Sequence, residues 1–343
     1  MVKMINFKKL VSQNFYLVIL IAFSLGFAGF FIYSIFDKYD LELDKISVIH
    51  KDQPRTARLL DGRIVLTKDA RWRPVIVMLE NHVDARPISG LENASIIYET
   101  IVEGDITRFL AIFDPLAPVQ KIGPVRSARS FFVEIAQEWN GVYFHAGGSP
   151  DSLAMLKTGN LYSVNEISGD GIYFWRDHSR TPPHNLYTSM YQINRSILAK
   201  EISTSTDFSP WSFKKTKVTA ELPSVATVEV NFSSNPWYQV KYIYNEESND
   251  YTRYQNDSVH KTDQGILLKA NNIIKQFVNA AIIDSYGRLE IDLISGGQAE
   301  VYLDGYKIDG QWKKENGRTR FYDSAGMEIK FNPGTIWVEL IFN

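Results

Sequence analysis

The sequence contains no cysteine at any of its 343 positions. This excludes disulfide bonds, thiolate catalysis, and zinc or iron–sulfur sites that are built on cysteine. It also excludes attachment to a membrane through a lipidated cysteine. The fold must therefore be held by packing alone, for which an apolar content of 45% and an aromatic content of 13% are ample.

The chain also has no excess of positive charge. Its formal net charge is −2, and residues 37–343 carry −5, because the first 36 residues hold three lysines and no acid. Binding to a nucleic-acid backbone requires clustered positive charge. We therefore expect no nucleic-acid partner.

One long stretch lacks charge altogether, the 22 residues Phe15–Phe36. A helix of this length extends about 33 Å, enough to cross a hydrocarbon core of about 30 Å. The preceding lysines, Lys3, Lys8 and Lys9, favour a cytoplasmic N-terminus. A cleaved signal peptide is the alternative, but its apolar region is usually about 7–15 residues long and ends in small side chains. We therefore expect a single-pass protein of the cytoplasmic membrane, anchored by Phe15–Phe36, with the bulk of the chain extracytoplasmic.

The hydrophobic pattern changes once more along the rest of the chain. Up to about residue 205, short apolar runs alternate with helical patterns, which is typical of an α/β domain. Beyond the polar stretch Ser203–Asp207 the helical signal nearly vanishes, and short strands separated by Asp-Gly, Asn-Gly and Pro-Gly turns predict a mostly-β domain. The expected segments are a cytoplasmic tail (1–14), a membrane anchor (15–36), a tether (37–57), an α/β domain (58–205) and a mostly-β domain (206–343).

The pattern also predicts individual elements. In the α/β domain we expect strands at Val75–Leu79, Ser95–Val102, Arg108–Phe113 and Val142–His145, and helices at Ser130–Trp139, after Ser149, and from Thr188 to Ile202. In the mostly-β domain we expect strands at Val225–Phe232, Tyr238–Tyr244, Ile273–Ile283, Arg288–Ile294, Glu300–Leu303 and Thr335–Phe342.

Three arginines predict an anion-binding site. Arg126 and Arg129 lie in the segment Gly123–Arg129, directly before the predicted helix at Ser130. A helix N-terminus offers free N–H groups and a partial positive charge, so arginines there favour phosphate or carboxylate. Arg108, at the start of a neighbouring strand, adds a third donor. The alternative is a structural network in which these arginines pair with nearby acids, among them Glu99, Glu103 and Asp105.

A glycine-rich turn follows the strand that ends at His145. Gly147 and Gly148 let a ligand approach the backbone, and Ser149 is placed to cap the next helix. This is not a phosphate-binding P-loop, because no Gly-Lys-Ser or Gly-Lys-Thr follows. The glycines are equally consistent with a tight turn that binds nothing.

Other polar residues carry weaker signals. His178 and His184 with Asp177 suggest a metal site or an acid–base pair, but their spacing matches no zinc signature, and we predict no metal site. Glu80-Asn81-His82 follows a buried strand, where polar groups either face a ligand or cap the sheet.

Several motifs together resemble the YerB-like family of membrane-attached bacterial proteins. They include Arg73–Met78, Ala85-Arg86-Pro87, Gly123–Arg129, His145–Ser149, Gly310-Gln311-Trp312 and Pro333-Gly334-Thr335. The resemblance covers about residues 55–343 and implies paired domains of unknown function in the bacterial envelope. Members of that family are often lipoproteins, whereas this chain lacks the cysteine.

A second resemblance is to the LytR-CpsA-Psr phosphotransferases, in which arginines and acids hold a polyprenyl pyrophosphate. The chain is similar in the order of its span, the strand at Arg108 and the arginines that follow. It departs from that family because Pro124-Val125-Arg126-Ser127 stands where a Pro-Arg-Asp stretch is characteristic.

The combined prediction is a cell-envelope binding or scaffolding module with an arginine-lined cleft for an anionic lipid or glycan. The alternative is a phosphotransferase or hydrolase that acts on a polyprenyl-pyrophosphate intermediate. The sequence assigns no catalytic residue, cofactor or protein partner. The residues expected at the cleft are Arg108, Arg126, Arg129, His145, Gly147, Gly148, Ser149, Glu99, Glu103 and His178.

Overall fold

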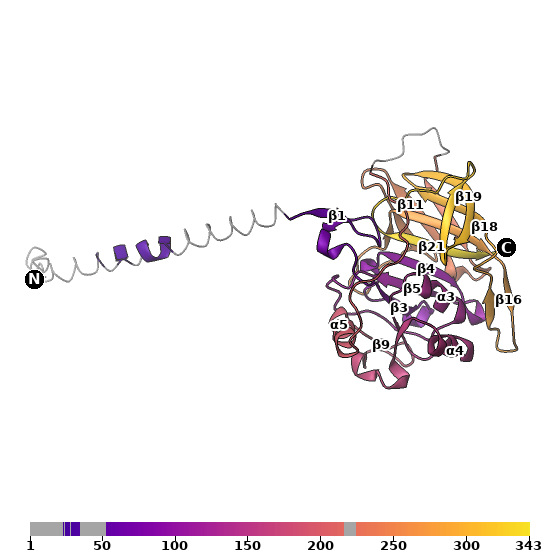
Figure 1. Cartoon of the computed structure of the whole chain (residues 1–343), viewed down its shortest axis with the longest axis horizontal. Coiled ribbons are helices and arrows are strands. Elements are labelled where there is room, and N and C mark those ends of the chain that lie inside the picture. The colour runs from indigo at the N-terminus through magenta and orange to yellow at the C-terminus, as the bar shows by residue number, and fades with distance from the viewer. Residues whose placement is uncertain (1–22, 24, 28, 35–52, 216–223) are drawn as a thin grey trace, which may run out of the picture. The chain divides into compact units, whose positions relative to one another are not determined.

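The structure is a computed structural model that describes residues 23, 25–27, 29–34, 53–215 and 224–343 (Figure 1). The chain divides into two compact units, Met1–Arg55 and Thr56–Asn343, and each is described by itself.

The predicted membrane helix Phe15–Phe36 lies mostly outside the described residues. Its described positions, 23, 25–27 and 29–34, are helical and exposed. Within the described part of the chain, no helix combines the length and the apolar character needed to cross a membrane. The predicted membrane helix is therefore unsupported.

A ten-stranded sheet forms the centre of the second unit, in the order β20-β19-β18-β15-β21-β4-β5-β3-β6-β7 (Figure 1). The parallel pair of β21 and β4, with Val338 opposite Tyr98, joins the two halves of the sequence. The N-terminal half supplies β3 (Val75–Glu80), β4 (Ile96–Ile101), β5 (Thr107–Phe113), β6 (Val142–His145) and β7 (Tyr162–Asn165). The C-terminal half supplies β15 (Asn272–Val278), β18 (Gly297–Leu303), β19 (Tyr306–Glu315), β20 (Arg318–Asp323) and β21 (Ile336–Phe342).

Both faces of the sheet are covered around β3, and every residue of this strand is buried. Successive side chains of a strand point to opposite faces, so a strand covered on both sides is apolar throughout. Ile76 and Met78 belong to one core cluster, and Val77 and Leu79 belong to the other. Burial on both faces therefore explains the continuous apolar run Val75–Leu79 in the sequence.

Helices cover these faces within the described residues of the unit. Ser149 caps α4 as predicted, with Pro150 at the first helical position. The cap of α5 is Ser189 and not the predicted Thr188, because the Ser189 hydroxyl accepts the backbone hydrogen bond. The first face carries α3 (Ser130–Glu138) and α4 (Pro150–Thr158), and the second carries α5 (Met190–Ala199).

A second sheet shares the face that carries α5. It contains the predicted strands near Val225–Phe232 and Tyr238–Tyr244, whose alternating pattern buries one side only. Its members are β10 (Thr227–Asn231), β11 (Gln239–Asn245), β12 (Asp250–Gln255), β13 (Ser258–Val259) and β14 (Lys269–Ala270).

Smaller elements complete the second unit. Two-stranded sheets pair β1 (Arg55–Ala57) with β2 (Ile64–Leu66), β8 (Trp175–Arg176) with β9 (Leu186–Tyr187), and β16 (Ala280–Ile282) with β17 (Leu289–Ile291). Short 3-10 helices are η1 (Thr67–Asp69), η2 (Val83–Ala85), η3 (Leu91–Asn93), η4 (Glu103–Asp105), η5 (Glu166–Ser168), η6 (Gly171–Tyr173) and η7 (Pro236–Tyr238).

The N-terminal region is therefore mixed α/β and the C-terminal region is mostly β, as predicted. The two regions share the central sheet and belong to one compact unit. The boundary near residue 205 stays a prediction.

Candidate functional site

The candidate site begins with two charged residues that face each other on the central sheet. Glu80 is the last residue of β3, and its register partner on β5 is Arg108. Both lie on the face that carries α3, because each is two or four positions along its strand from residues of that core, Ile76 and Met78 on β3 and Leu110 and Ile112 on β5. The end of β3 therefore presents a carboxylate beside a guanidinium.

Arg126 reaches the same place from the segment before α3. This segment follows β3 closely, since the Arg126 amide donates to the Met78 carbonyl at 2.9 Å and the Glu80 amide donates to the Pro124 carbonyl at 3.0 Å. The Arg126 Nε atom then lies 3.0 Å from Glu80 Oε1. Backbone pairing thus fixes this ion pair.

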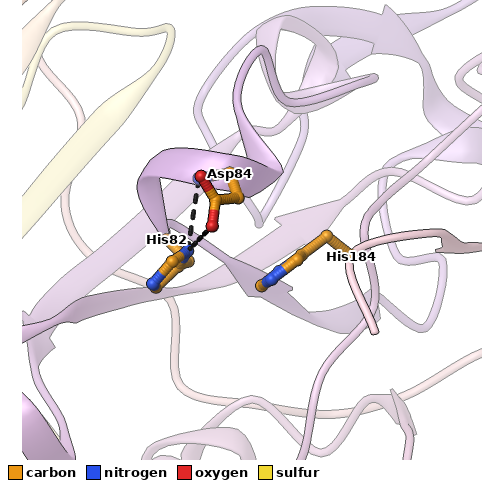
Figure 2. Close-up of side chains that lie close together, drawn as sticks. All are labelled: His82, Asp84 and His184. Atoms are coloured by element: carbon orange, nitrogen blue, oxygen red, sulfur yellow. Dashed lines mark hydrogen bonds and ion pairs between the residues drawn. The ribbon is translucent and has the colours of Figure 1, made fainter. Parts of the chain in front are cut away.

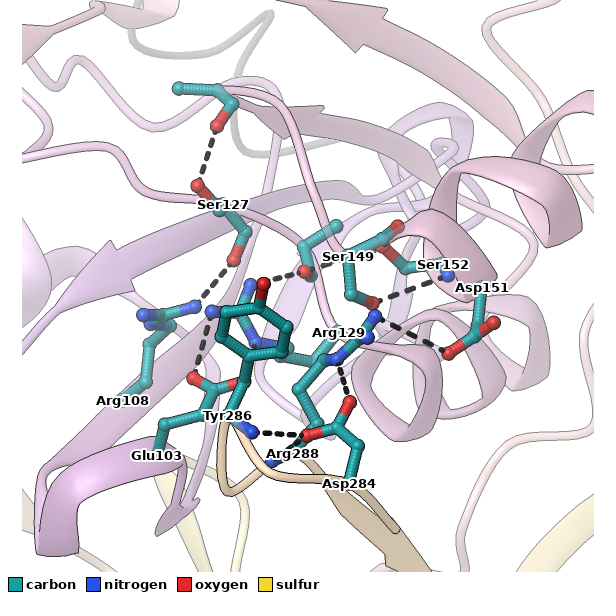
Figure 3. A network of polar contacts seen from close by, with 12 residues as sticks. Glu103, Arg108, Ser127, Arg129, Ser149, Asp151, Ser152, Asp284, Tyr286 and Arg288 are labelled. Atoms are coloured by element: carbon teal, nitrogen blue, oxygen red, sulfur yellow. Dashed lines mark hydrogen bonds and ion pairs between the residues drawn. The ribbon is translucent and has the colours of Figure 1, made fainter.

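Arg129 lies at the N-cap position of α3 and binds a different acid. Its guanidinium meets both carboxylate oxygens of Glu103, with Nη2 donating to Oε2 at 2.8 Å (Figure 3). Burial opposes ionisation of Glu103, yet the hydrogen bond and charge of Arg129 lower its pKa. This pair is one part of the structural network that the sequence analysis gave as an alternative, in which the arginines bind nearby acids.

Arg108 differs from the other two arginines. It is 8% exposed, and its Nη1 atom donates to the Ser127 carbonyl at 2.7 Å (Figure 3). Within the described residues no carboxylate lies within ion-pair distance of it. Burial first, and then the charge of Arg129, lower the pKa of Arg108 to about 9. Arg108 is therefore a buried cation with incomplete compensation.

The turn after β6 is next to the arginines, but both ring nitrogens of its histidine already have partners. His145 is buried, and its two ring nitrogens meet the Gly147 carbonyl at 2.7 Å and the Ser163 hydroxyl at 2.8 Å. Burial lowers the pKa of His145, so the ring is neutral at pH 7. The structure therefore gives His145 a structural position.

The two glycines and Ser149 build the turn itself. Gly147 has φ +66°, and its amide donates to Asn165 Oδ1 at 2.8 Å. A Cβ atom on Gly148 would lie 2.5 Å from Ser152 Oγ. The Ser149 hydroxyl accepts from the Ser152 amide at 3.4 Å. The Ser149 amide also donates to the Ala128 carbonyl at 3.2 Å, which places the start of α4 beside Ala128, directly before Arg129.

Two predicted residues lie apart from the arginines. Glu99 is on the opposite face of the sheet, where it pairs with Arg253 of β12. His178 is exposed in the loop after β8, and in the described part of the chain it makes no polar contact with the cluster. The structure thus brings together Arg108, Arg126, Arg129 and Glu103, and separates Glu99 and His178 from them.

Two histidines at the end of β3 were not predicted to meet. The Nδ1 atom of His184 lies 3.0 Å from Glu80 Oε2, and its ring centroid is 4.9 Å from that of His82. Asp84 contacts His82 from the next turn of chain (Figure 2). Each motif was visible in the sequence, but nothing local indicated that residues about a hundred positions apart converge on Glu80.

The C-terminal region also reaches this part of the molecule. The turn between β16 and β17 places Tyr286 and Arg288 near Arg129 and the start of α4 (Figure 3). Arg288 Nη1 lies 3.9 Å from Asp151 Oδ2 and also pairs with Asp284. Residues of both halves therefore border the arginine cluster.

Known proteins resemble this chain along most of its length. Residues 60–203 match the model described as "Protein of unknown function (DUF3048) N-terminal domain", and residues 228–338 match the corresponding C-terminal domain. The "Putative lipoprotein YerB" of Bacillus subtilis (strain 168) is 36% identical over 304 residues, which cover 86% of this chain and 91% of that protein. The crystal structure of the YerB protein from Bacillus subtilis matches with a TM-score of 0.75 and 33% identity, covering 82% of this chain and 95% of that one.

These findings correct the predicted location. The relative is named as a lipoprotein and not as a membrane-spanning protein. The described residues of this chain contain no helix suited to span a membrane. The predicted location, a single-pass protein of the cytoplasmic membrane, is therefore wrong.

Proposed function

This chain belongs to the YerB-like family of paired DUF3048 domains, and from that premise we propose that it is an anion-binding module whose ligand contacts Arg108, Arg126 and Arg129. The supporting observation is the buried guanidinium of Arg108. Together with its neighbours Arg126 and Arg129 it makes three arginines against two glutamates, Glu80 and Glu103.

The charge balance explains why an anion fits. Burying a charge is costly unless it is paired. Arg126 and Arg129 each have an acid within ion-pair distance, whereas Arg108 bonds a carbonyl and shares the more distant charges of Glu80 and Glu103 with those two arginines. A phosphate or carboxylate next to Arg108 supplies the missing negative charge, and guanidinium groups bind such oxygens through two donors.

The site also remains open to a ligand at its edge. The Arg126 side chain is 28% exposed and that of Arg129 is 17% exposed. An anion can therefore reach these two groups from solvent and lie against Arg108 beneath them. The bacterial relative is named a putative lipoprotein, a class of protein that is attached to membranes, and we therefore propose an anionic lipid or glycan of the cell envelope as the ligand class.

The test is thermal denaturation of the full chain with and without pyrophosphate, repeated for Arg108→Gln. A ligand at a hundred times its Kd adds about 2.7 kcal/mol of stability. We expect the midpoint to rise for the natural chain and not for Arg108→Gln. Arg195→Gln, an exposed arginine on α5, is the matched control. An equal rise in all three proteins would refute the site.

A second candidate function is transfer or hydrolysis of a phosphoryl group on a lipid-linked pyrophosphate. It is favoured by the contact of His184 with Glu80, next to Arg126. A carboxylate that orients an imidazole is the arrangement of a general acid–base pair. Arg126 would hold a phosphate oxygen while His184 exchanges a proton with the reacting group. Turnover of such a substrate that survives His184→Ala would remove this candidate.

A further inference from the structure

Three potential metal ligands converge at the end of β3. His82 and Asp84 come from the chain that leaves this strand, and His184 comes from the loop between β8 and β9 (Figure 2). One ligand atom from each side chain lies within 4.8 Å of the other two. We propose that His82, Asp84 and His184 bind a divalent transition-metal ion of the zinc class.

The distances suit a shared ion. His82 Nδ1 and Asp84 Oδ2 are 3.5 Å apart. Two ligands with bonds of about 2.0–2.1 Å at a tetrahedral angle are separated by about 3.4 Å. An ion can therefore lie between these two atoms with little movement of either side chain.

Glu80 prepares His184 for the same ion. Its Oε2 atom is buried and lies 3.0 Å from His184 Nδ1, which is within ion-pair distance, although the two atoms are not aligned as a hydrogen bond. A histidine that ligates a metal usually directs its other ring nitrogen at a carboxylate, which fixes the ring and its tautomer. With Nδ1 beside the Glu80 carboxylate, the Nε2 lone pair of His184 is left for the metal.

Local structure alone does not account for all three side chains. His82 Nδ1 accepts a hydrogen bond from the Asp84 amide at 3.2 Å, so these two residues also form an ordinary turn. Metal binding at His82 Nδ1 replaces that single bond. The turn does not explain why His184 arrives from a distant loop with its side chain only 14% exposed.

The donor set selects the class of ion. Two imidazoles and one carboxylate suit zinc and its first-row neighbours, whereas magnesium and calcium prefer oxygen ligands. Three protein ligands also leave one position of a tetrahedral ion open, as in zinc sites that bind water or substrate. The inference does not depend on anion binding at Arg108.

The test is a titration of the tag-free full chain with Zn²⁺ by calorimetry and with Co²⁺ by visible absorption. We expect one ion per chain and the d–d bands of tetrahedral Co²⁺. His184→Ala and His82→Ala should each weaken binding by far more than Glu80→Gln, for which a loss of about 10–100-fold is expected. His178→Ala, an exposed histidine outside the cluster, is the matched control and should bind as the natural chain does.

Two results would overturn the proposal. One is no binding above that of the same chain with both His82 and His184 replaced by alanine. The other is a loss in His178→Ala as large as that in His184→Ala. Thermal midpoints measured without metal show whether each variant folds. If an alanine variant does not fold, the weaker metal binding expected for Glu80→Gln still tests the site.

Chemical modification of His184 with and without Zn²⁺ distinguishes metal binding from proton transfer, because both roles use the Nε2 lone pair. If Zn²⁺ binds and blocks ethoxycarbonylation of His184 by diethyl pyrocarbonate, the metal holds that atom. If Zn²⁺ leaves the modification rate unchanged, His184 is not a ligand and the proposed site is wrong.

Discussion

Arg253 of β12 and Glu99 of β4 form an ion pair in which both side chains are completely buried. Glu99 also accepts a hydrogen bond from Asn81 Nδ2 at 3.0 Å. The Arg253 guanidinium lies 4.6 Å from the ring centroid of Trp337 on β21. One charged pair therefore fastens the second sheet to the central sheet, across the two halves of the sequence.

Breaking this pair should destabilise the fold strongly. Glu99→Gln leaves the Arg253 charge buried without its partner, and such changes cost about 3–5 kcal/mol. We expect a loss of that size in the free energy of unfolding by urea. The matched control is Asp257→Asn, which removes the exposed pair with Lys241 and should cost at most about 1 kcal/mol. Equal losses in the two variants would contradict this role of the buried pair.

Glu339, the register partner of Glu99, should make stability depend on pH. Burial first, and then the charge of Glu99, raise the pKa of Glu339 to about 8. The folded state therefore keeps a proton that the unfolded state releases near its ordinary value of 4.5. Its contribution to stability is complete at low pH and is lost as the pH rises to about 8, at up to about 1.4 kcal/mol per pH unit.

A neighbouring histidine sets the pH window for this measurement. Burial, and then the charge of Arg253, lower the pKa of His260 well below 6.5. Its contribution is therefore present above about pH 6.5 and is lost as the pH falls below that value. Urea unfolding between about pH 6.5 and 8 isolates Glu339. We expect stability to decline there in the natural chain and to be flat in Glu339→Gln, and an unchanged slope would count against the assignment.

The sequence predicted individual strands and helix ends better than it predicted which strands pair. The strand Val142–His145 and the cap at Ser149 are local signals, set by hydrophobic pattern and by helix-end chemistry, and the structure has both. The pairing of Val338 with Tyr98 is a contact between distant segments, and no periodicity specifies it.

The candidate site divides in the same way. Arg126 and Arg129 were identifiable because they directly precede a helix. Glu99 was grouped with them from sequence proximity to Glu103, but alternation along β4 puts it on the other face of the sheet. The meeting of His184 with Glu80 depends on how a long loop returns to the sheet, which the sequence does not encode locally.

His145 should matter for stability and not for ligand binding. Both of its ring nitrogens already have partners inside the protein. His145→Leu leaves the Ser163 hydroxyl and the Gly147 carbonyl without that partner, which costs about 1–3 kcal/mol. We expect this loss in urea unfolding together with unchanged pyrophosphate affinity by calorimetry. A tenfold loss of affinity in a folded variant would instead return His145 to the site.

Arg108 and Arg129 should respond in opposite directions when each is replaced by methionine. Arg129→Met leaves Glu103 partly buried without its guanidinium, so the free energy of unfolding should fall by about 1–3 kcal/mol. Arg108→Met removes a buried cation that has no acid within ion-pair distance in the described structure, and the ligand-free chain should become more stable by about 1–2 kcal/mol.

Measuring pyrophosphate binding distinguishes two explanations for Arg108. Either it is kept for ligand binding at a cost in stability, or it is only a packing residue. If Arg108 is kept for an anion, the more stable Arg108→Met chain should lose pyrophosphate affinity, as expected where a site carries strain that its ligand relieves. Urea unfolding with and without pyrophosphate measures both effects on one protein. If Arg108→Met is destabilised as much as Arg129→Met, the Ser127 carbonyl is sufficient compensation for the guanidinium, and the main support for an anion at this site is gone.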